Sequence, residues 1–138
     1  MINRDTNLGN DPPAGFVVAV VDDDESILRS LGDLLESADY TVWLFRSATA
    51  LLDTGRLVEI DCVVSDIDMP GMDGFDMLRL IHAKRPGMPI IFITGYPQRF
   101  NAPPLIPGGV VPRGFTKPFR AEDLLAAVGD AVRNTSSE

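Results

Sequence analysis

Residues 16–24 read FVVAVVDDD, an unbroken apolar run that ends in consecutive carboxylates. Such a run is typical of a strand that is buried on both faces, as the strands of a parallel sheet are. Apolar residues then recur at helical spacing: Ile27, Leu28, Leu31, Leu34, Leu35 and Ala38. The sequence therefore predicts a strand over 16–21, followed by a helix that packs on the sheet.

The order of strand and helix continues along the chain. Further strands are predicted at 40–45, 62–66, 90–94 and 114–116. Further helices are expected after a cap at Ser47, from Phe75, after a loop that includes Gly74, to a point before Pro86, and over 122–132, where Glu122 and Asp123 open the helix. Alternating strands and helices predict an α/β fold with right-handed crossovers.

The segment from Gly95 to Pro112 departs from this alternation. A helix is expected there, but the segment holds five prolines: Pro97, Pro103, Pro104, Pro107 and Pro112. Each proline lacks an amide donor and clashes with the preceding turn of a helix. We therefore expect an atypical or shortened fourth helix within an irregular or mobile segment.

Length and composition limit the possible organisation. A chain of 138 residues fits one domain with a substantial core. The polar ends favour a flexible extension over 1–15, a folded domain over 16–133 and a flexible tail over 134–138. Whether the domain stands alone or belongs to a longer protein stays open.

The charge and the cysteine content narrow the partners and the compartment. A net charge of −8 argues against a general nucleic-acid surface, which needs clustered lysine and arginine. The single cysteine, Cys62, lies in an apolar strand, which suits a buried residue in a reducing compartment. No stretch has the length of a membrane span or the pattern of a signal peptide. We expect a cytoplasmic protein, in which this domain binds neither nucleic acid nor membrane.

Chemically active side chains lie at the ends of four predicted strands. Asp22 and Asp23 follow the first strand, Asp66 ends the third, Thr94 ends the fourth, and Lys117 follows the last. The carboxyl ends of parallel strands line one crevice, so these groups should meet there. Carboxylates with a hydroxyl and an ammonium group are suited to bind Mg²⁺ and to transfer a phosphoryl group.

Each of these side chains has an expected role. Asp66 is the candidate nucleophile, because a carboxylate can attack phosphorus to give an acyl phosphate. Asp22 and Asp23 would repel an incoming phosphoryl group unless a cation such as Mg²⁺ lies between them. Lys117 offers a positive charge, and Thr94 offers a hydroxyl that can hydrogen-bond the attached group.

Structural roles alone would account for some of the same residues. Asp24 and Glu25 suit the start of a helix, where carboxylates cap free amides. Asp66, taken alone, could be a turn residue before Pro70. His82, the only histidine, falls on the third predicted helix, away from the crevice, and is expected at the surface or its boundary.

Four motifs occur in order along the chain: VVDDDES, VVSDIDMPGMDG, FITGY and FTKPF. This pattern resembles the response-regulator receiver domain of two-component signalling. The resemblance implies a flavodoxin-like, doubly wound, five-stranded parallel sheet flanked by helices. It also implies that Asp66 accepts a phosphoryl group from a sensor histidine kinase or a histidine phosphotransfer protein, and that an unknown downstream protein reads the result.

The resemblance also assigns the metal ligands. Mg²⁺ would be held by Asp23, Asp66 and the backbone carbonyl of Asp68, with Asp22 acting largely through water. The Lys117–Pro118 peptide is expected to be cis. A domain of this kind assists its own phosphorylation and dephosphorylation, and is not an enzyme that turns over a separate substrate.

Further residues are expected to modify switching. In this family the side chains at Asp68 and Tyr96 tend to tune hydrolysis of the acyl phosphate. Gly114 stands where an aromatic residue usually follows the motion of the threonine, and Phe115 should face the opposite side of the strand. We therefore hypothesise that signalling starts at Thr94 and is read out by the segment from Gly95 to Pro112.

Two other functions stay open. The residues Asp66, Ile67 and Asp68 echo the paired aspartates of haloacid-dehalogenase-like phosphatases. Those enzymes usually place the pair after their first strand and need a further cap, and neither feature is seen here. The other possibility is a receiver-like interaction module that never carries phosphate.

Overall fold

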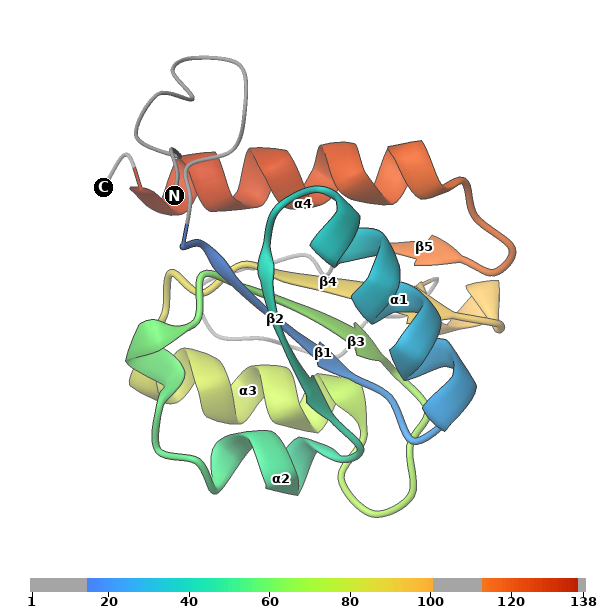
Figure 1. Cartoon of the computed structure of the whole chain (residues 1–138). Helices are drawn as coiled ribbons and strands as arrows, with labels where there is room; N and C mark the ends of the chain where they lie inside the picture. The colour runs from blue at the N-terminus through green and yellow to red at the C-terminus, as the bar shows by residue number, and fades with distance from the viewer. Residues whose placement is uncertain (1–14, 101–112, 137–138) are drawn as a thin grey trace.

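The computed structural model describes residues 15–100 and 113–136. Its centre is a five-stranded parallel sheet of order β2-β1-β3-β4-β5 (Figure 1). The strands are β1 (Val17–Val21), β2 (Thr41–Phe45), β3 (Cys62–Asp66), β4 (Ile90–Thr94) and β5 (Arg113–Thr116). The helices are α1 (Glu25–Ser37), α2 (Ala48–Leu52), α3 (Gly74–Lys84) and α4 (Ala121–Ser136), with 3-10 turns η2 (Leu57–Glu59) and η3 (Pro97–Phe100). The predicted α/β fold is confirmed.

Helices cover both faces of the sheet. Figure 1 shows α1 and α4 on one face and α2 and α3 on the other. Successive strand residues point to opposite faces, so β1 sends Val18 and Val20 under α1 and α4, and Ala19 and Val21 under α2 and α3. The two apolar cores explain why the first strand is apolar along its whole length.

Side-chain caps turn the chain from strand into helix. The carboxylate of Asp24 accepts from the backbone amides of Ser26 and Ile27 at the start of α1. Ser47 caps α2 in the same way, and Asp73 caps α3. The capping role expected for Asp24 is confirmed, which leaves Asp22 and Asp23 available for other contacts.

The crossover from β4 to β5 is irregular in its described part. The 3-10 turn η3 stands where a helix would follow β4, in agreement with an atypical fourth helix. Residues 101–112 lie outside the described residues, so the hypothesis of a readout through this segment stays a hypothesis. The expected extension over 1–15 lies almost wholly outside them too, and α4 ends at Ser136, inside the expected tail.

The alternation expected in β5 is present. Phe115 packs in the core beneath α1 and α4, with its ring centroid 6.2 Å from that of Phe119. It therefore does not replace the aromatic residue that is missing at Gly114. Among the described residues, none of the helices combines the length and the apolar composition needed to cross a membrane.

Candidate functional site

Three carboxylates meet at the carboxyl ends of neighbouring strands. Val21 pairs with Ser65 in the parallel register, so Asp22 comes level with Asp66. Asp22, Asp23 and Asp66 each offer an oxygen, and these oxygens all lie within 4.8 Å of one another. The structure therefore brings together the three side chains that the sequence placed at strand ends.

Burial and mutual repulsion oppose the charges of this acid cluster (Asp22, Asp23 and Asp66). Burial, followed by the charge of Asp22, raises the pKa of Asp66 from 3.8 to about 6. Burial also raises the pKa of Asp22, although the amide of Asp24 donates to its Oδ1 at 2.8 Å and favours the charged form. Two acids that are disfavoured as anions therefore lie beside each other.

This donor set fits a hard divalent cation. All the contributed ligand atoms are carboxylate oxygens, the type that Mg²⁺ and Ca²⁺ prefer. A cation between the carboxylates would offset both the burial of charge and the repulsion that raise the pKa of Asp66. The acid cluster could therefore hold the Mg²⁺ that the sequence predicts, whereas a contribution from the Asp68 carbonyl stays a prediction.

Thr94 and Lys117 lie beside the acid cluster. Thr94 is fully buried, and its Oγ1 accepts the backbone amide of Tyr96 at 3.0 Å. The Lys117 amide donates to the Thr94 carbonyl at 2.7 Å, and the Lys117–Pro118 peptide is cis, as expected. The Lys117 ammonium group favours the charged forms of Asp22 and Asp66, although it makes no direct ion pair in the described part of the chain.

Two residues near the site escaped the sequence prediction. Gly74, interpreted as a loop residue, is the first residue of α3, and a Cβ there would lie 2.6 Å from the Asp66 carbonyl oxygen. Arg99 reaches from η3 to the side chains of Asp68 and Asp73. The glycine itself was the one signal in the sequence that a side chain is missing close to Asp66. Nothing in the pattern around Arg99 indicated its partners.

His82 lies away from the acid cluster, as expected. It is half-buried near the end of α3, with Nε2 3.0 Å from the carbonyl oxygen of Met88. It therefore has a local structural partner.

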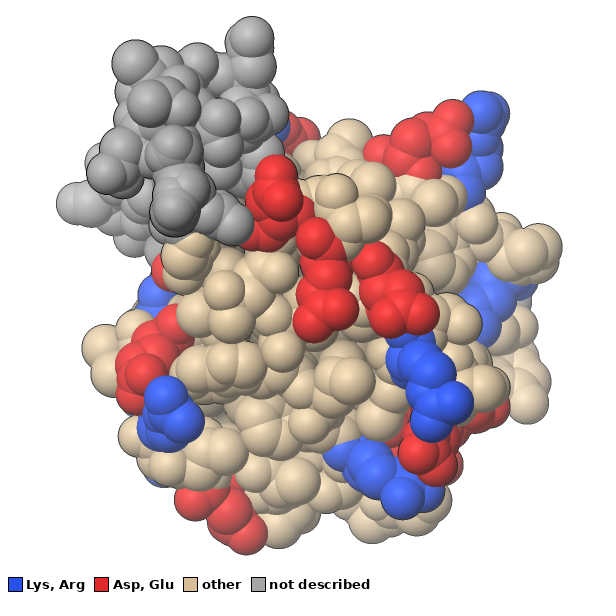
Figure 2. Space-filling view, viewed as in Figure 1, with Lys and Arg blue, Asp and Glu red and all other residues tan. Residues whose placement is uncertain are grey.

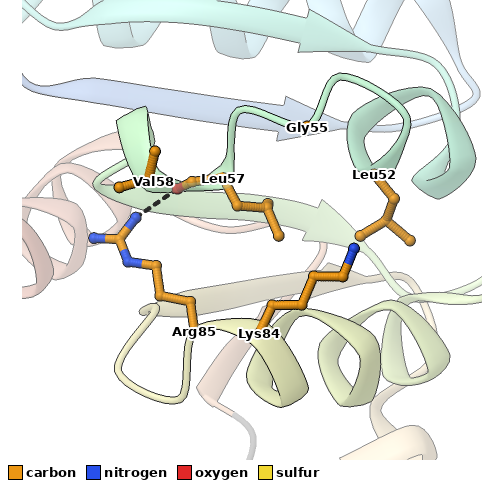
Figure 3. Close-up of a pocket in the computed structure, with 6 residues that line it drawn as sticks. All are labelled: Leu52, Gly55, Leu57, Val58, Lys84 and Arg85. Atoms are coloured by element: carbon orange, nitrogen blue, oxygen red, sulfur yellow. Dashed lines mark hydrogen bonds between the residues drawn. The ribbon is translucent and has the colours of Figure 1, made fainter.

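A pocket of about 380 Å³ lies at the opposite edge of the sheet, where α2 and α3 end. Its lining residues are Leu52, Gly55, Leu57, Val58, Lys84 and Arg85. Figure 3 shows Lys84 extending towards Leu52, and Arg85 donating to the Leu57 carbonyl. None of the predicted site residues lines this pocket, so it is separate from the acid cluster.

The surface over α1 is acidic. Figure 2 shows acidic side chains gathered on the face that carries this helix, where Asp33, Glu36 and Asp39 are exposed. A nucleic-acid backbone would need clustered cations instead. This face therefore does not suit nucleic acid.

Comparison with known proteins gives consistent matches. "Response regulator protein TmoT" of Ectopseudomonas mendocina is 41% identical over 118 residues, which are 85% of this chain and 53% of that protein. "Transcriptional regulatory protein FixJ" of Bradyrhizobium diazoefficiens is 37% identical over 116 residues, 84% of this chain and 56% of that protein. This chain thus spans about half the length of these curated relatives.

Solved structures agree with the sequence relatives. The crystal structure of a response regulator receiver domain protein from Clostridium thermocellum superimposes with a TM-score of 0.78 at 30% identity. That match covers 88% of this chain and 98% of the other. The sequence model for the response regulator receiver domain matches residues 18–129, a span that contains β2 to β5, all of β1 except its first residue, and every residue of the acid cluster. This chain is therefore a member of the response regulator receiver domain family of two-component systems.

Proposed function

We propose that this domain accepts a phosphoryl group on Asp66 and thereby switches a protein-binding surface. The observation that carries the proposal is the acid cluster, whose three carboxylate oxygens lie within 4.8 Å of one another at the strand ends. Asp66 is the most suitable acceptor of the three, because it is partly exposed whereas Asp22 is buried, and because it ends the central strand.

In this proposal Mg²⁺ is held by Asp22, Asp23, Asp66 and the backbone carbonyl of Asp68. Bound there, the ion would supply positive charge to the oxygens of the transferred group. An oxygen of Asp66 forms a bond to phosphorus while the phosphorus–nitrogen bond of the donor's phosphohistidine breaks, and the imidazole leaves.

Two further side chains contact the attached group. Lys117 offers its ammonium group to the phosphoryl oxygens, so these oxygens interact with the lysine as well as with the metal ion. The Thr94 hydroxyl donates a hydrogen bond to one of these oxygens, and its movement begins the change of the surface. Two observations support these roles. The charge of Lys117 acts on Asp66 and favours its charged form. Asp66 pairs with Ile93 in the sheet, so Thr94 follows directly at the end of the neighbouring strand.

The partners follow from the chemistry. The donor is a sensor histidine kinase or a histidine phosphotransfer protein, and a downstream protein binds the switched surface. Phosphoryl transfer from this donor and binding of the downstream protein would both take place in the cytoplasm. The names of the relatives, which are response regulators and transcriptional regulators, support this assignment.

The direct test is intact-mass spectrometry after incubation with acetyl phosphate and Mg²⁺. The wild type should gain one phosphoryl adduct, and Asp66→Asn should gain none. Asp53→Asn, which changes an exposed aspartate at the end of α2, should still gain the adduct. An adduct on Asp66→Asn would exclude Asp66 as the acceptor, and a wild type that stays unmodified even with a histidine kinase would exclude the function.

A further inference from the structure

Arg99 connects the segment after Thr94 to the loop after Asp66. Its Nε lies 3.2 Å from Oδ1 of Asp68, and a terminal guanidinium nitrogen lies 3.4 Å from Oδ2 of Asp73. Its Cζ also lies 5.4 Å from the ring centroid of Phe75, a cation–π distance. These contacts hold the Arg99 side chain over the loop between β3 and α3.

The two carboxylate oxygens of Asp68 face different partners. Oδ1 faces Arg99, and Oδ2 accepts the Thr94 hydroxyl at 3.4 Å. The oxygen of that hydroxyl also accepts the Tyr96 amide. A hydroxyl has one proton, so Thr94 cannot donate to Asp68 and to a phosphoryl group on Asp66 at the same time.

These contacts are loose enough to rearrange. A distance of 3.4 Å is long for an O–H···O hydrogen bond. Arg99 Nε is buried without an aligned hydrogen-bond acceptor, so its contact with Asp68 is an ion pair only. A stronger acceptor near Thr94 could therefore replace Asp68 at low cost.

We propose that Arg99 is a positioning residue, which holds Asp68 as the acceptor of the Thr94 hydroxyl and so keeps that hydroxyl away from Asp66 in the unphosphorylated domain. The inference rests on the function proposed above, in which Thr94 contacts the phosphoryl group. Without Arg99, Asp68 can turn towards solvent, and the hydroxyl is released more easily. The phosphorylated arrangement then becomes more favourable relative to the unphosphorylated one.

The test is the affinity for beryllofluoride, a mimic of the phosphoryl group, with Mg²⁺ present, measured by titration calorimetry. Arg99→Ala should bind about two- to five-fold more tightly than the wild type, which is the effect that a partly exposed ion pair can produce. Arg99→Lys keeps a cation near Asp68 and should show a smaller change.

Arg56 provides a matched control at the other end of the sheet. It also has both an ion pair, 2.8 Å from Glu59, and a cation–π contact, 4.4 Å from the Trp43 ring. Arg56→Ala should therefore bind the mimic like the wild type.

A second background separates positioning from a general loss of structure. In Thr94→Ala there is no hydroxyl to release, so adding Arg99→Ala should leave the affinity for the mimic unchanged. Weaker or unchanged binding by Arg99→Ala alone, or an effect that persists without the Thr94 hydroxyl, would overturn the proposal.

The free protein gives an independent readout. The Tyr96 amide donates to Thr94 Oγ1, so its NMR resonance should shift in Arg99→Ala and stay in place in Arg56→Ala. A wild type that fails to bind the mimic would contradict the proposed function, and this resonance would still decide the role of Arg99. An unshifted Tyr96 amide in Arg99→Ala would refute that role.

Discussion

Asp66 holds a negative charge that its surroundings oppose. Burial and the neighbouring charge of Asp22 raise its pKa from 3.8 to about 6. Because the pKa is higher in the folded state, the charge destabilises the fold fully above about pH 6, and this effect is absent below pH 3.8. The proposed acceptor is thus a group that the metal-free fold would keep more easily as the neutral acid.

Asp66→Asn should therefore stabilise the metal-free protein at pH 7.5. The difference between the two pKa values corresponds to about 3 kcal/mol, and solvent screening at this partly exposed group should reduce the gain to the order of 1 kcal/mol. The measurement is urea unfolding with a chelator, at pH 7.5 and below pH 4. Asp53→Asn removes the same charge from the surface and is the control. A gain of equal size at both pH values would contradict the assignment.

Mg²⁺ should stabilise the wild type, in which the metal-free acid cluster is destabilising. At a concentration ten times the dissociation constant, a bound ion stabilises the fold by about 1.4 kcal/mol, which corresponds to roughly 3–6 °C in a domain of this size. Thermal unfolding with and without Mg²⁺ should show this rise for the wild type and little of it for Asp23→Asn. Asp24→Asn keeps the cap of α1 and should keep the rise. The same rise with sodium chloride at matched ionic strength would point to general screening.

At the scale of elements, the position of α3 depends on Gly74. A Cβ at this residue would lie 2.6 Å from the Asp66 carbonyl oxygen and 2.9 Å from Cε1 of Phe92. The first contact is with backbone, which cannot move without displacing the end of β3. The absence of a side chain therefore lets α3 begin directly beside the proposed acceptor.

Gly74→Ala should destabilise the protein by about 1–3 kcal/mol, the usual cost of overpacking. Gly129→Ala is the matched control, because its Cβ would meet only the flexible end of Arg133, at 3.4 Å. In the middle of α4 that change should leave the free energy of unfolding the same or raise it by up to about 1 kcal/mol, because alanine favours the helix. Urea unfolding of both variants gives the comparison, and equal effects would show that close contact does not explain Gly74.

The sequence predicted the elements better than their contacts. The predicted strands match every described strand to within about a residue, and the capping residues Asp24 and Ser47 marked where helices begin. Gly74 was interpreted as a loop residue, because an amino-acid pattern shows that a side chain is missing but not what the space is needed for. The end of the chain differed as well, since α4 continues to Ser136.

For the whole molecule, one topological rule placed most of the candidate site. Parallel strands end at the same edge, so Asp22, Asp66, Thr94 and Lys117 could be brought together although up to ninety-five positions separate them. The partners of Arg99 could not be found in this way. Arg99 lies in a proline-rich segment without periodicity, and its contact with Asp68 spans thirty-one positions.

Cys62 reports on the stability of the whole sheet. It lies on β3, the central strand, and its side chain is fully buried. Burial raises the pKa of its thiol from 9.0 to about 12, so the reactive thiolate is suppressed in the folded state. Access to this thiol requires separating the central strand from α1 and α4, which cover its core.

A thiol reagent at pH 8 should therefore label Cys62 only when the whole domain unfolds. The free energy of opening obtained from the labelling rate should equal the free energy of unfolding measured with urea, because no smaller motion exposes the central strand. Val58 is 80% exposed, so Val58→Cys in a Cys62→Ala background should be labelled at the rate of a free thiol. Labelling of Cys62 at a lower free energy than global unfolding would mean that β3 opens locally. In that case the strand that ends at Asp66 would not be a rigid support for the acid cluster.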